Sequence, residues 1–209
     1  ISLCMSVSRE TEMAKAMSKD MITSPSAESL AEAVRAAQGK GLPPVHKWNP
    51  EFCGDLDMRI AADGTWFYQG TPINRFALAR LFSTILRREG DSYFLVTPVE
   101  KVGITVDDAP FVAVDVEAEG SGAAQELICE RKGGGGVVAG PGNPIRVERD
   151  DATGEPRPYV MVRDGLEALI DRKSFYRLAG IGTQKDGWFG LWSGGAFFRM
   201  IPQADLSEG

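Results

Sequence analysis

Apolar residues recur at helical spacing near the start of the chain. The stretch 26–38 places Leu30 and Val34 on one face, and Ser26 stands where an N-cap residue accepts a bond from the first turn. Gly39 follows and favours the end of a helix. This pattern predicts a helix of about three turns.

A second helical pattern lies within 71–90. Arg87 and Arg88 would occupy its last turn, where positive charge interacts favourably with the helix dipole, and Gly90 would end it. We therefore expect one helix that runs to Arg88. Its apolar stripe consists of Leu78, Leu81, Phe82, Ile85 and Leu86.

Two Asp-Gly pairs, each between apolar runs, predict two β-hairpins. "LDMRIAADGTWFYQG" surrounds Asp63-Gly64, and "EPRPYVMVRDGLEALI" surrounds Asp164-Gly165. These residues tolerate the positive φ that a two-residue hairpin turn requires. A short helix that begins after Asp171, its predicted N-cap, follows the second hairpin.

The remaining segments predict short strands and glycine-rich connections. "FVAVDVEAE" at 111–119 alternates valine with smaller or acidic residues, which is typical of a sheet with one face in water. "GGGVVA" at 134–139 matches the spacing of a dinucleotide-binding fingerprint, but that motif requires a helix after it. Gly140-Pro141-Gly142 blocks such a helix, so we interpret the stretch as a connection between strands.

Elements in the same order occur twice: hairpin, helix, Asp and aromatic strand. Four residues of the first copy, Ile73, Arg75, Arg80 and Leu81, align without a gap on Ile170, Arg172, Arg177 and Leu178. The sequence therefore predicts an α+β fold of two related small domains, mostly antiparallel sheets each with a packed helix. We expect a tail at 1–24, an N-terminal domain at 25–120 and a C-terminal domain at 121–209.

Charge and cysteine content restrict the class of protein. The net charge of −6 argues against general nucleic-acid binding, which depends on an excess of Lys and Arg. Cys4, Cys53 and Cys129 are too few and too dispersed for a disulfide framework or a zinc site, and we interpret Cys53 as a buried structural thiol. No apolar run is long enough for a membrane span. These features predict a cytoplasmic protein.

His46 is the only histidine, so it could contribute to chemistry only in a mixed site. Together with Asp55 and Asp57 it could form a small metal or acid–base cluster. Asp57 and Arg59 lie one pleat apart on one strand face, so an ion pair is an equally natural interpretation. No catalytic residue and no cofactor can be assigned from this pattern.

Several long motifs resemble one bacterial family, domain of unknown function 1285. They include "PPVHKWNPEFCGDLDMRIAADGTWFYQGTPI", "VTPVEKVGITVDDAPFVAVDVE" and "GEPRPYVMVRDGLEALIDRKSFY", and the similar region spans 42–200. The resemblance implies a duplicated core whose C-terminal half is superficially like a pleckstrin-homology fold. It also implies a cleft between the halves, a nucleotide-like ligand and a role in signal transduction.

The resulting hypothesis is a non-enzymatic module that binds a small nucleotide-like anion between the halves and signals to a partner protein. Arg side chains suit phosphate or carboxylate groups, and aromatic rings can stack on a base. A metal-assisted hydrolase that uses His46, Asp55 and Asp57, and a protein-interaction adaptor without a small ligand, are the alternatives. The candidate ligand-binding residues are His46, Trp48, Asp55, Asp57, Arg59, Glu100, Lys101, Arg146, Arg157 and Tyr159.

Overall fold

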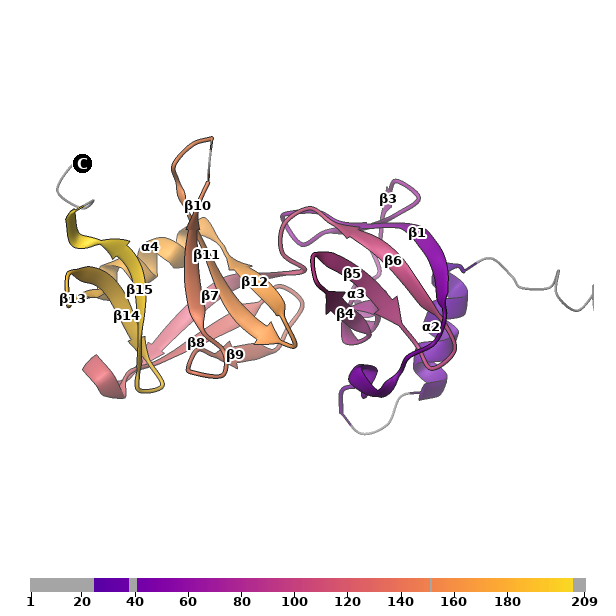
Figure 1. Cartoon of the computed structure of the whole chain (residues 1–209), viewed down its shortest axis with the longest axis horizontal. Coiled ribbons are helices and arrows are strands. Elements are labelled where there is room, and N and C mark those ends of the chain that lie inside the picture. Colours follow the sequence, from indigo (N-terminus) through magenta and orange to yellow (C-terminus); the bar gives the residue numbers. More distant parts are fainter. Residues whose placement is uncertain (1–24, 38–40, 151, 205–209) are drawn as a thin grey trace, which may run out of the picture.

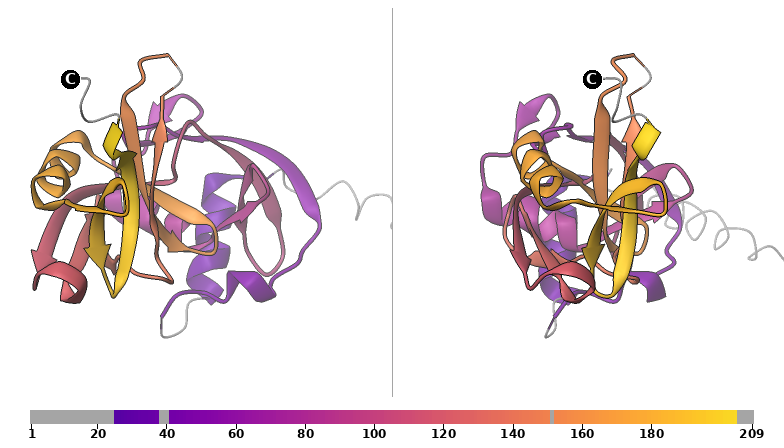
Figure 2. Two further views of the ribbon diagram at one scale, coloured as in Figure 1. Left: turned by 60° about the vertical axis from the view of Figure 1, so that its left-hand side comes forward. Right: turned by 90° about the vertical axis from the view of Figure 1, so that its left-hand side faces the viewer.

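Two domains follow each other along the long axis of the molecule. The structure, a computed structural model, describes residues 25–37, 41–150 and 152–204. Figure 1 shows the N-terminal domain at one end of the molecule and the C-terminal domain, with the small sheet of β13, β14 and β15, at the other. When the molecule is turned by 90°, the C-terminal domain lies in front of the N-terminal domain (Figure 2). The predicted tail at 1–24 and the helix end at Gly39 lie outside the described residues.

The N-terminal domain is a six-stranded sheet with two helices on one face. Its strand order is β3-β2-β1-β6-β5-β4, and all neighbours are antiparallel except β1 and β6, which run parallel. The apolar face carries Met58, Leu95 and Val102, and it packs against Leu30 and Phe82 of the helices. The elements are α2 (Ala27–Ala37), η1 (Val45–Lys47), β1 (Phe52–Ile60), β2 (Trp66–Tyr68), β3 (Thr71–Pro72), α3 (Phe76–Thr84), β4 (Leu86–Glu89), β5 (Ser92–Val96) and β6 (Lys101–Val106).

The C-terminal domain contains a second six-stranded sheet and a separate three-stranded sheet. The larger sheet has the order β10-β11-β12-β7-β8-β9, with β12 and β7 parallel, and the smaller has the order β13-β14-β15. Helix α4 buries Phe175 and Leu178 against this core. The elements are β7 (Phe111–Glu119), η2 (Gly122–Ala124), β8 (Glu126–Arg131), β9 (Gly136–Val138), β10 (Ile145–Arg149), β11 (Pro156–Arg163), β12 (Leu166–Ile170), α4 (Arg172–Ile181), β13 (Thr183–Lys185), β14 (Trp188–Ser193) and β15 (Ala196–Pro202).

These sheets confirm the predicted fold class, α+β with mostly antiparallel sheets and packed helices. The order hairpin, helix, three strands also occurs in both domains, but the strands pair differently. In the N-terminal domain, the strands after the helix join the sheet of the hairpin, whereas those after α4 form a sheet of their own. The second hairpin instead pairs with the strands that precede it. The duplication itself stays a prediction.

The helix predicted to run to Arg88 is wrong at its C-terminal end. Helix α3 ends at Thr84, and Leu86–Glu89 pairs with β5 as an edge strand. The positive φ of Gly90 belongs to the turn between these strands. The buried residues Ile85 and Leu86 fit a helical pattern and a strand pattern equally well. Pairing with β5 decides in favour of the strand.

The two Asp-Gly turns differ. Asp164 and Gly165 both have positive φ, as a two-residue hairpin turn requires. At the first hairpin only Gly64 does, and the Ala61 amide donates to the Thr65 carbonyl oxygen, which leaves three residues in the loop. The two-residue turn predicted there is therefore wrong. Its form matches a three-residue loop with glycine in the left-handed position.

Strand β7 departs from the predicted alternation because it contains a bulge. The register passes from Ala113 opposite Arg131 to Asp115 opposite Glu130, so one residue is extra. As a result Val114 is exposed while Ala113 and Val116 are both buried. The chain changes sheets between β6 and β7, before the loop at 120–125 in which the sequence placed the domain boundary.

Candidate functional site

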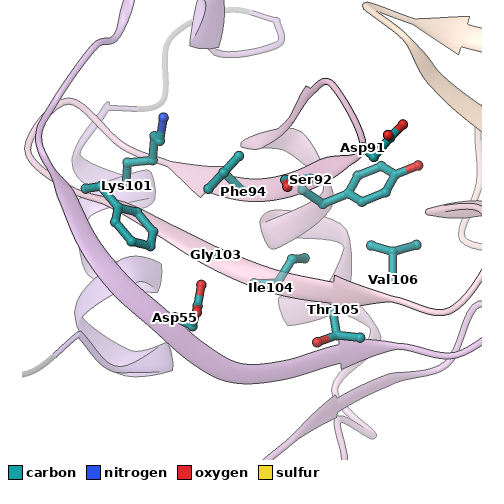
Figure 3. Close-up of a pocket in the computed structure, with 11 residues that line it drawn as sticks. Asp55, Asp91, Ser92, Phe94, Lys101, Gly103, Ile104, Thr105 and Val106 are labelled. Atoms are coloured by element: carbon teal, nitrogen blue, oxygen red, sulfur yellow. The ribbon is translucent and has the colours of Figure 1, made fainter.

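A groove of about 540 Å³ lies on the face of the N-terminal sheet opposite the helices. The sheet provides its floor where the parallel strands β1 and β6 meet and its wall along β5. Figure 3 shows Lys101 and Asp55 on opposite sides of Gly103, with Asp91 at the far end. The lining residues are Phe52, Asp55, Asp91, Ser92, Tyr93, Phe94, Lys101, Gly103, Ile104, Thr105 and Val106.

Gly103 makes room for the carboxylate of Asp55. The two residues are register partners in the parallel pair, next to irregularities in β1 on either side. A Cβ atom on residue 103 would lie 2.1 Å from Asp55 Oδ1, so no other residue fits without displacing that carboxylate. The groove therefore contains a carboxylate that is held close to the sheet surface.

Aromatic rings and a lysine form the other end of the groove. The rings of Phe52 and Phe94 meet edge to face at 6.0 Å, and 54% of Phe52 is exposed. The ammonium of Lys101 lies 4.5 Å from the centre of the Phe94 ring and donates to Glu89 Oε2 at 2.7 Å. That bond holds the pKa of Glu89 below its usual value.

A second group of polar residues lies at the junction of the domains. Asp108, in the connection between β6 and β7, accepts a bond from the Tyr159 hydroxyl at 2.8 Å and one from Arg157 at 2.6 Å. Burial, and then the bond to Asp108, raise the pKa of Tyr159 to about 12. The carboxylate of Asp108 thus ties the interdomain connection to β11.

Arg146 and Glu167 extend this group across the sheet. Two nitrogens of Arg146 donate to the two carboxylate oxygens of Glu167, both at 2.6 Å, and its guanidinium lies 4.4 Å from the centre of the Tyr159 ring. Glu167 is only 8% exposed, and the two parallel bonds from Arg146 give each oxygen of this buried carboxylate a hydrogen-bond donor. We call Asp108, Arg146, Arg157, Tyr159 and Glu167 the junction cluster.

Arg88 connects the groove to the junction cluster. Its guanidinium lies 5.6 Å from the centre of the ring of Tyr93, a groove residue. It donates to the carbonyl oxygen of Gly165 in the other domain at 3.2 Å and lies 3.9 Å from Glu167. Burial is the main cause that raises the pKa of Tyr93. One arginine therefore contacts both the groove and the C-terminal domain.

A smaller hollow of about 430 Å³ lies beside the first turn of α4. Arg157 of the junction cluster lines it, together with Asp150, which also pairs with Arg157 at 3.3 Å. Asp171 caps α4 by accepting a bond from the Ser174 amide at 2.8 Å, which confirms the predicted cap.

The structure brings together about half of the predicted ligand-binding residues. Asp55 and Lys101 line the groove, and Arg146, Arg157 and Tyr159 belong to the junction cluster.

The other five predicted residues belong neither to the groove nor to the junction cluster. Arg59 forms its ion pair with Asp107 at 2.7 Å rather than with Asp57. His46 is exposed in η1, the Trp48 carbonyl oxygen accepts a bond from Arg87, and Asp57 is exposed on β1. Glu100 lies in the turn before β6, where burial raises its pKa.

No group of three or more potential metal-binding side chains occurs in the part of the chain that the structure describes. The hydrolase alternative therefore stays a prediction without supporting geometry. Cys53 is exposed, so its interpretation as a buried thiol is wrong. Cys129 is buried, and burial raises the pKa of its thiol to about 11. Within the described residues, no helix is both long and apolar enough to cross a membrane.

Sequence reasoning missed Gly103, Tyr93, Asp108 and Glu167. The sequence offered a signal for Asp108, because the pair Asp107-Asp108 directly precedes Ala109-Pro110 at the end of a predicted strand. The others depend on which strands become neighbours. A glycine in an apolar strand and a glutamate between a leucine and an alanine carry no local sign of a site.

Comparison with protein families identifies the relatives of this chain. Residues 43–109 match "Domain of unknown function (DUF1285), N-terminal domain", and residues 110–200 match "Protein of unknown function (DUF1285), C-terminal domain". The chain belongs to the DUF1285 family. The boundary between the two matches lies at the connection that carries Asp108. The comparison with curated proteins found no match.

Two solved structures are similar to this chain. A DUF1285 family protein from Silicibacter pomeroyi DSS-3 is 64% identical, with a TM-score of 0.81 over 86% of this chain and 98% of that one. A DUF1285 family protein from Shewanella baltica OS155 is 29% identical, with a TM-score of 0.47 over 60% of this chain and 91% of that one. The relatives are bacterial, as predicted, while the pleckstrin-homology likeness stays a prediction.

Proposed function

We propose that this DUF1285 protein is a ligand-binding module that takes a small nucleotide-like anion in the groove and reports its presence to the C-terminal domain. The observation that carries the proposal is the groove itself. It combines an exposed aromatic ring, a carboxylate and a lysine in about 540 Å³, a volume within the usual range of small-molecule sites.

Each lining group has a part in binding. The exposed ring of Phe52 offers a face against which a planar base can stack. Asp55 accepts hydrogen bonds from ring N–H or sugar O–H groups, in a position that Gly103 keeps open. Lys101 has three N–H donors and gives one to Glu89, which leaves donors for an anionic group.

The contacts of Arg88 supply the route from the groove to the other domain. A ligand that displaces the Tyr93 ring also displaces the guanidinium stacked on it. That movement changes the bond from Arg88 to the Gly165 carbonyl oxygen and its approach to Glu167. Binding in one domain thereby alters contacts in the second, as a signalling module with a partner protein requires.

A thermal-shift screen with purine and pyrimidine nucleotides at millimolar concentration tests the proposal, because a ligand that binds only the folded state raises the melting temperature. We expect at least one nucleotide to stabilise the wild type and to lose this effect with Phe52→Ala. Leu42→Ala is the matched control, since Leu42 is also an exposed apolar residue, at 62%, and does not line the groove. No stabilisation by any nucleotide, or equal stabilisation of F52A, would refute the proposal.

A further inference from the structure

The hollow beside α4 is a second cavity, which the proposed function does not use. It lies where β11 begins and β12 ends, and its volume of about 430 Å³ is within the usual range of small-molecule sites. None of its lining residues also lines the groove of the N-terminal domain, so the two sites are separate. The apolar part of its lining consists of Pro156, Pro158, Leu169, Ile170 and Phe175.

Tyr176 adds an exposed aromatic ring to this apolar lining. The residue is 61% exposed, whereas Phe175 beside it is buried, and the centres of the two rings lie 6.3 Å apart. A ligand with an apolar side chain would cover surface of the hollow that water now contacts, and this burial favours binding. The hollow therefore suits a ligand that is partly apolar.

Three of the five charged side chains that line the hollow are engaged within the fold. Asp150 accepts bonds from two backbone amides of its own turn and pairs with Arg157 at 3.3 Å. Arg157 also donates to Asp108 at 2.6 Å. Asp171 accepts a bond from the Ser174 amide as the cap of α4. These three side chains build the wall of the hollow.

The other two charged side chains, Arg172 and Glu155, form an open ion pair at the rim. Their closest atoms, Nη2 and Oε1, lie 3.2 Å apart, and the side chains are 70% and 57% exposed. Arg172 Nε also donates to the Tyr176 hydroxyl at 3.2 Å. A guanidinium has five N–H donors and a carboxylate accepts several bonds, so both members of the pair keep bonding capacity for a ligand.

Two opposite charges beside an apolar hollow fit a zwitterion. A ligand with a carboxylate alone would be attracted by Arg172 and repelled by Glu155, and a ligand with an amine alone would meet the reverse. An α-amino acid carries both charges next to one carbon, so its carboxylate can face the guanidinium while its ammonium faces the Glu155 carboxylate. Its side chain can then enter the hollow.

We propose that the hollow beside α4 binds a free α-amino acid with a large apolar side chain, such as phenylalanine. Arg172 holds the carboxylate of the ligand, and Glu155 holds its ammonium. The exposed ring of Tyr176 packs against the ligand's side chain, which lies in the hollow against Ile170 and Phe175. The site belongs to the C-terminal domain and does not depend on nucleotide binding in the groove.

Isothermal titration of the full chain with L-phenylalanine tests the proposal. We expect saturable binding by the wild type and about tenfold or weaker binding by Arg172→Gln and Glu155→Gln, because each variant loses a bond between charged groups. Both residues are exposed, so these substitutions leave the core intact. Arg177→Gln is the matched control, because Arg177 is also an exposed arginine of α4, pairs with Asp115 and does not line the hollow.

Three analogues test the parts of the ligand separately. Phenylpropionate lacks the ammonium, phenethylamine lacks the carboxylate, and glycine lacks the apolar side chain. We expect each to bind about tenfold more weakly than phenylalanine, or weaker still. Either of the first two binding as tightly as phenylalanine would show that the rim does not recognise a zwitterion. Equal binding of glycine would show that the hollow takes no side chain, and any of these results would overturn the proposal.

Two further results count against the proposal: no binding of phenylalanine or leucine by the wild type at millimolar concentration, or R172Q that binds phenylalanine as tightly as the wild type. Phe52→Ala separates this site from the groove. F52A should bind phenylalanine as the wild type does, and R172Q should keep the thermal shift that nucleotides produce. Loss of phenylalanine binding in F52A would place the amino acid in the groove and refute the site beside α4.

Discussion

The carboxylate of Asp108 provides the sharpest test of how the domains are joined. Asp108→Ala removes the acceptor for the Tyr159 hydroxyl and for Arg157, at 2.8 and 2.6 Å. Tyr159 is buried, at 4% exposed, so its hydroxyl would lose its acceptor where water reaches it poorly. A buried polar group left unsatisfied costs about 1–3 kcal/mol. The Arg157 side chain is 36% exposed, so water compensates part of the second loss.

Together these losses amount to about 3 kcal/mol. For a chain of this length that free energy corresponds to a fall of roughly 6–12 °C in melting temperature. Asp107→Ala is the matched control, because within the described part of the chain Asp107 forms an ion pair with Arg59 alone, and the Arg59 side chain is 48% exposed. An exposed pair of this kind contributes about 1 kcal/mol or less.

Urea unfolding of D108A, Tyr159→Phe and the double variant measures the coupling between the two groups. We expect Y159F to cost about 1.5 kcal/mol and the coupling energy to be about 1 kcal/mol, because both single variants remove the same bond. Additive effects, or a cost for D108A no greater than that of D107A, would show that the bond between the carboxylate and the hydroxyl does not stabilise the fold.

The dependence on pH has a definite sign. The pKa of Tyr159 is raised from 10.0 to about 12 in the folded state, so the unfolded state loses this proton first as pH rises. The stabilisation that comes from the neutral hydroxyl is complete below pH 10 and is lost as pH rises through 12. Wild-type stability should therefore fall more steeply than that of Y159F between pH 10 and 12. Parallel curves in that range would contradict the raised pKa.

Three further predictions concern the C-terminal domain. Gly190→Ala should lower the free energy of unfolding in urea by about 2–3 kcal/mol, because the new Cβ would lie 2.3 Å from the Phe198 carbonyl oxygen. Gly180→Ala is the control: this residue lies in α4 with open space around it, so the substitution should stabilise the fold by about 0.5–1 kcal/mol. Equal effects of the two substitutions would refute this prediction. Asp171→Ala should cost about 1 kcal/mol through loss of the helix cap, and an unchanged midpoint would exclude that role. A thiol reagent at pH 8 should modify Cys129 only in urea, since burial raises its pKa to about 11; a native-state adduct on that residue, found by peptide mapping, would contradict its burial.

Local chemistry in the sequence determined the elements whose boundaries depend on neighbouring residues. Asp171 caps α4 because its side chain reaches an amide three residues away. Asp164-Gly165 forms its two-residue turn because both residues accept positive φ. Ser26 likewise accepts a bond from the Ser29 amide at 3.1 Å, as an N-cap residue does. These interactions span a few residues, so the sequence displays both partners together.

Tertiary structure decided the features that depend on pairing between distant segments. The apolar residues Ile85 and Leu86 suit a helix or a strand, and the chain leaves the helix because Leu86 pairs with Leu95. The groove exists because β1 lies parallel to β6, which places Gly103 beside Asp55. The junction cluster likewise forms only when β10, β11 and β12 pair and the connection that carries Asp108 lies beside β11. Residue type alone suggests which groups can bind an anion. Many local patterns are compatible with more than one strand pairing, so the distances between those groups are set only when the sheet register is fixed.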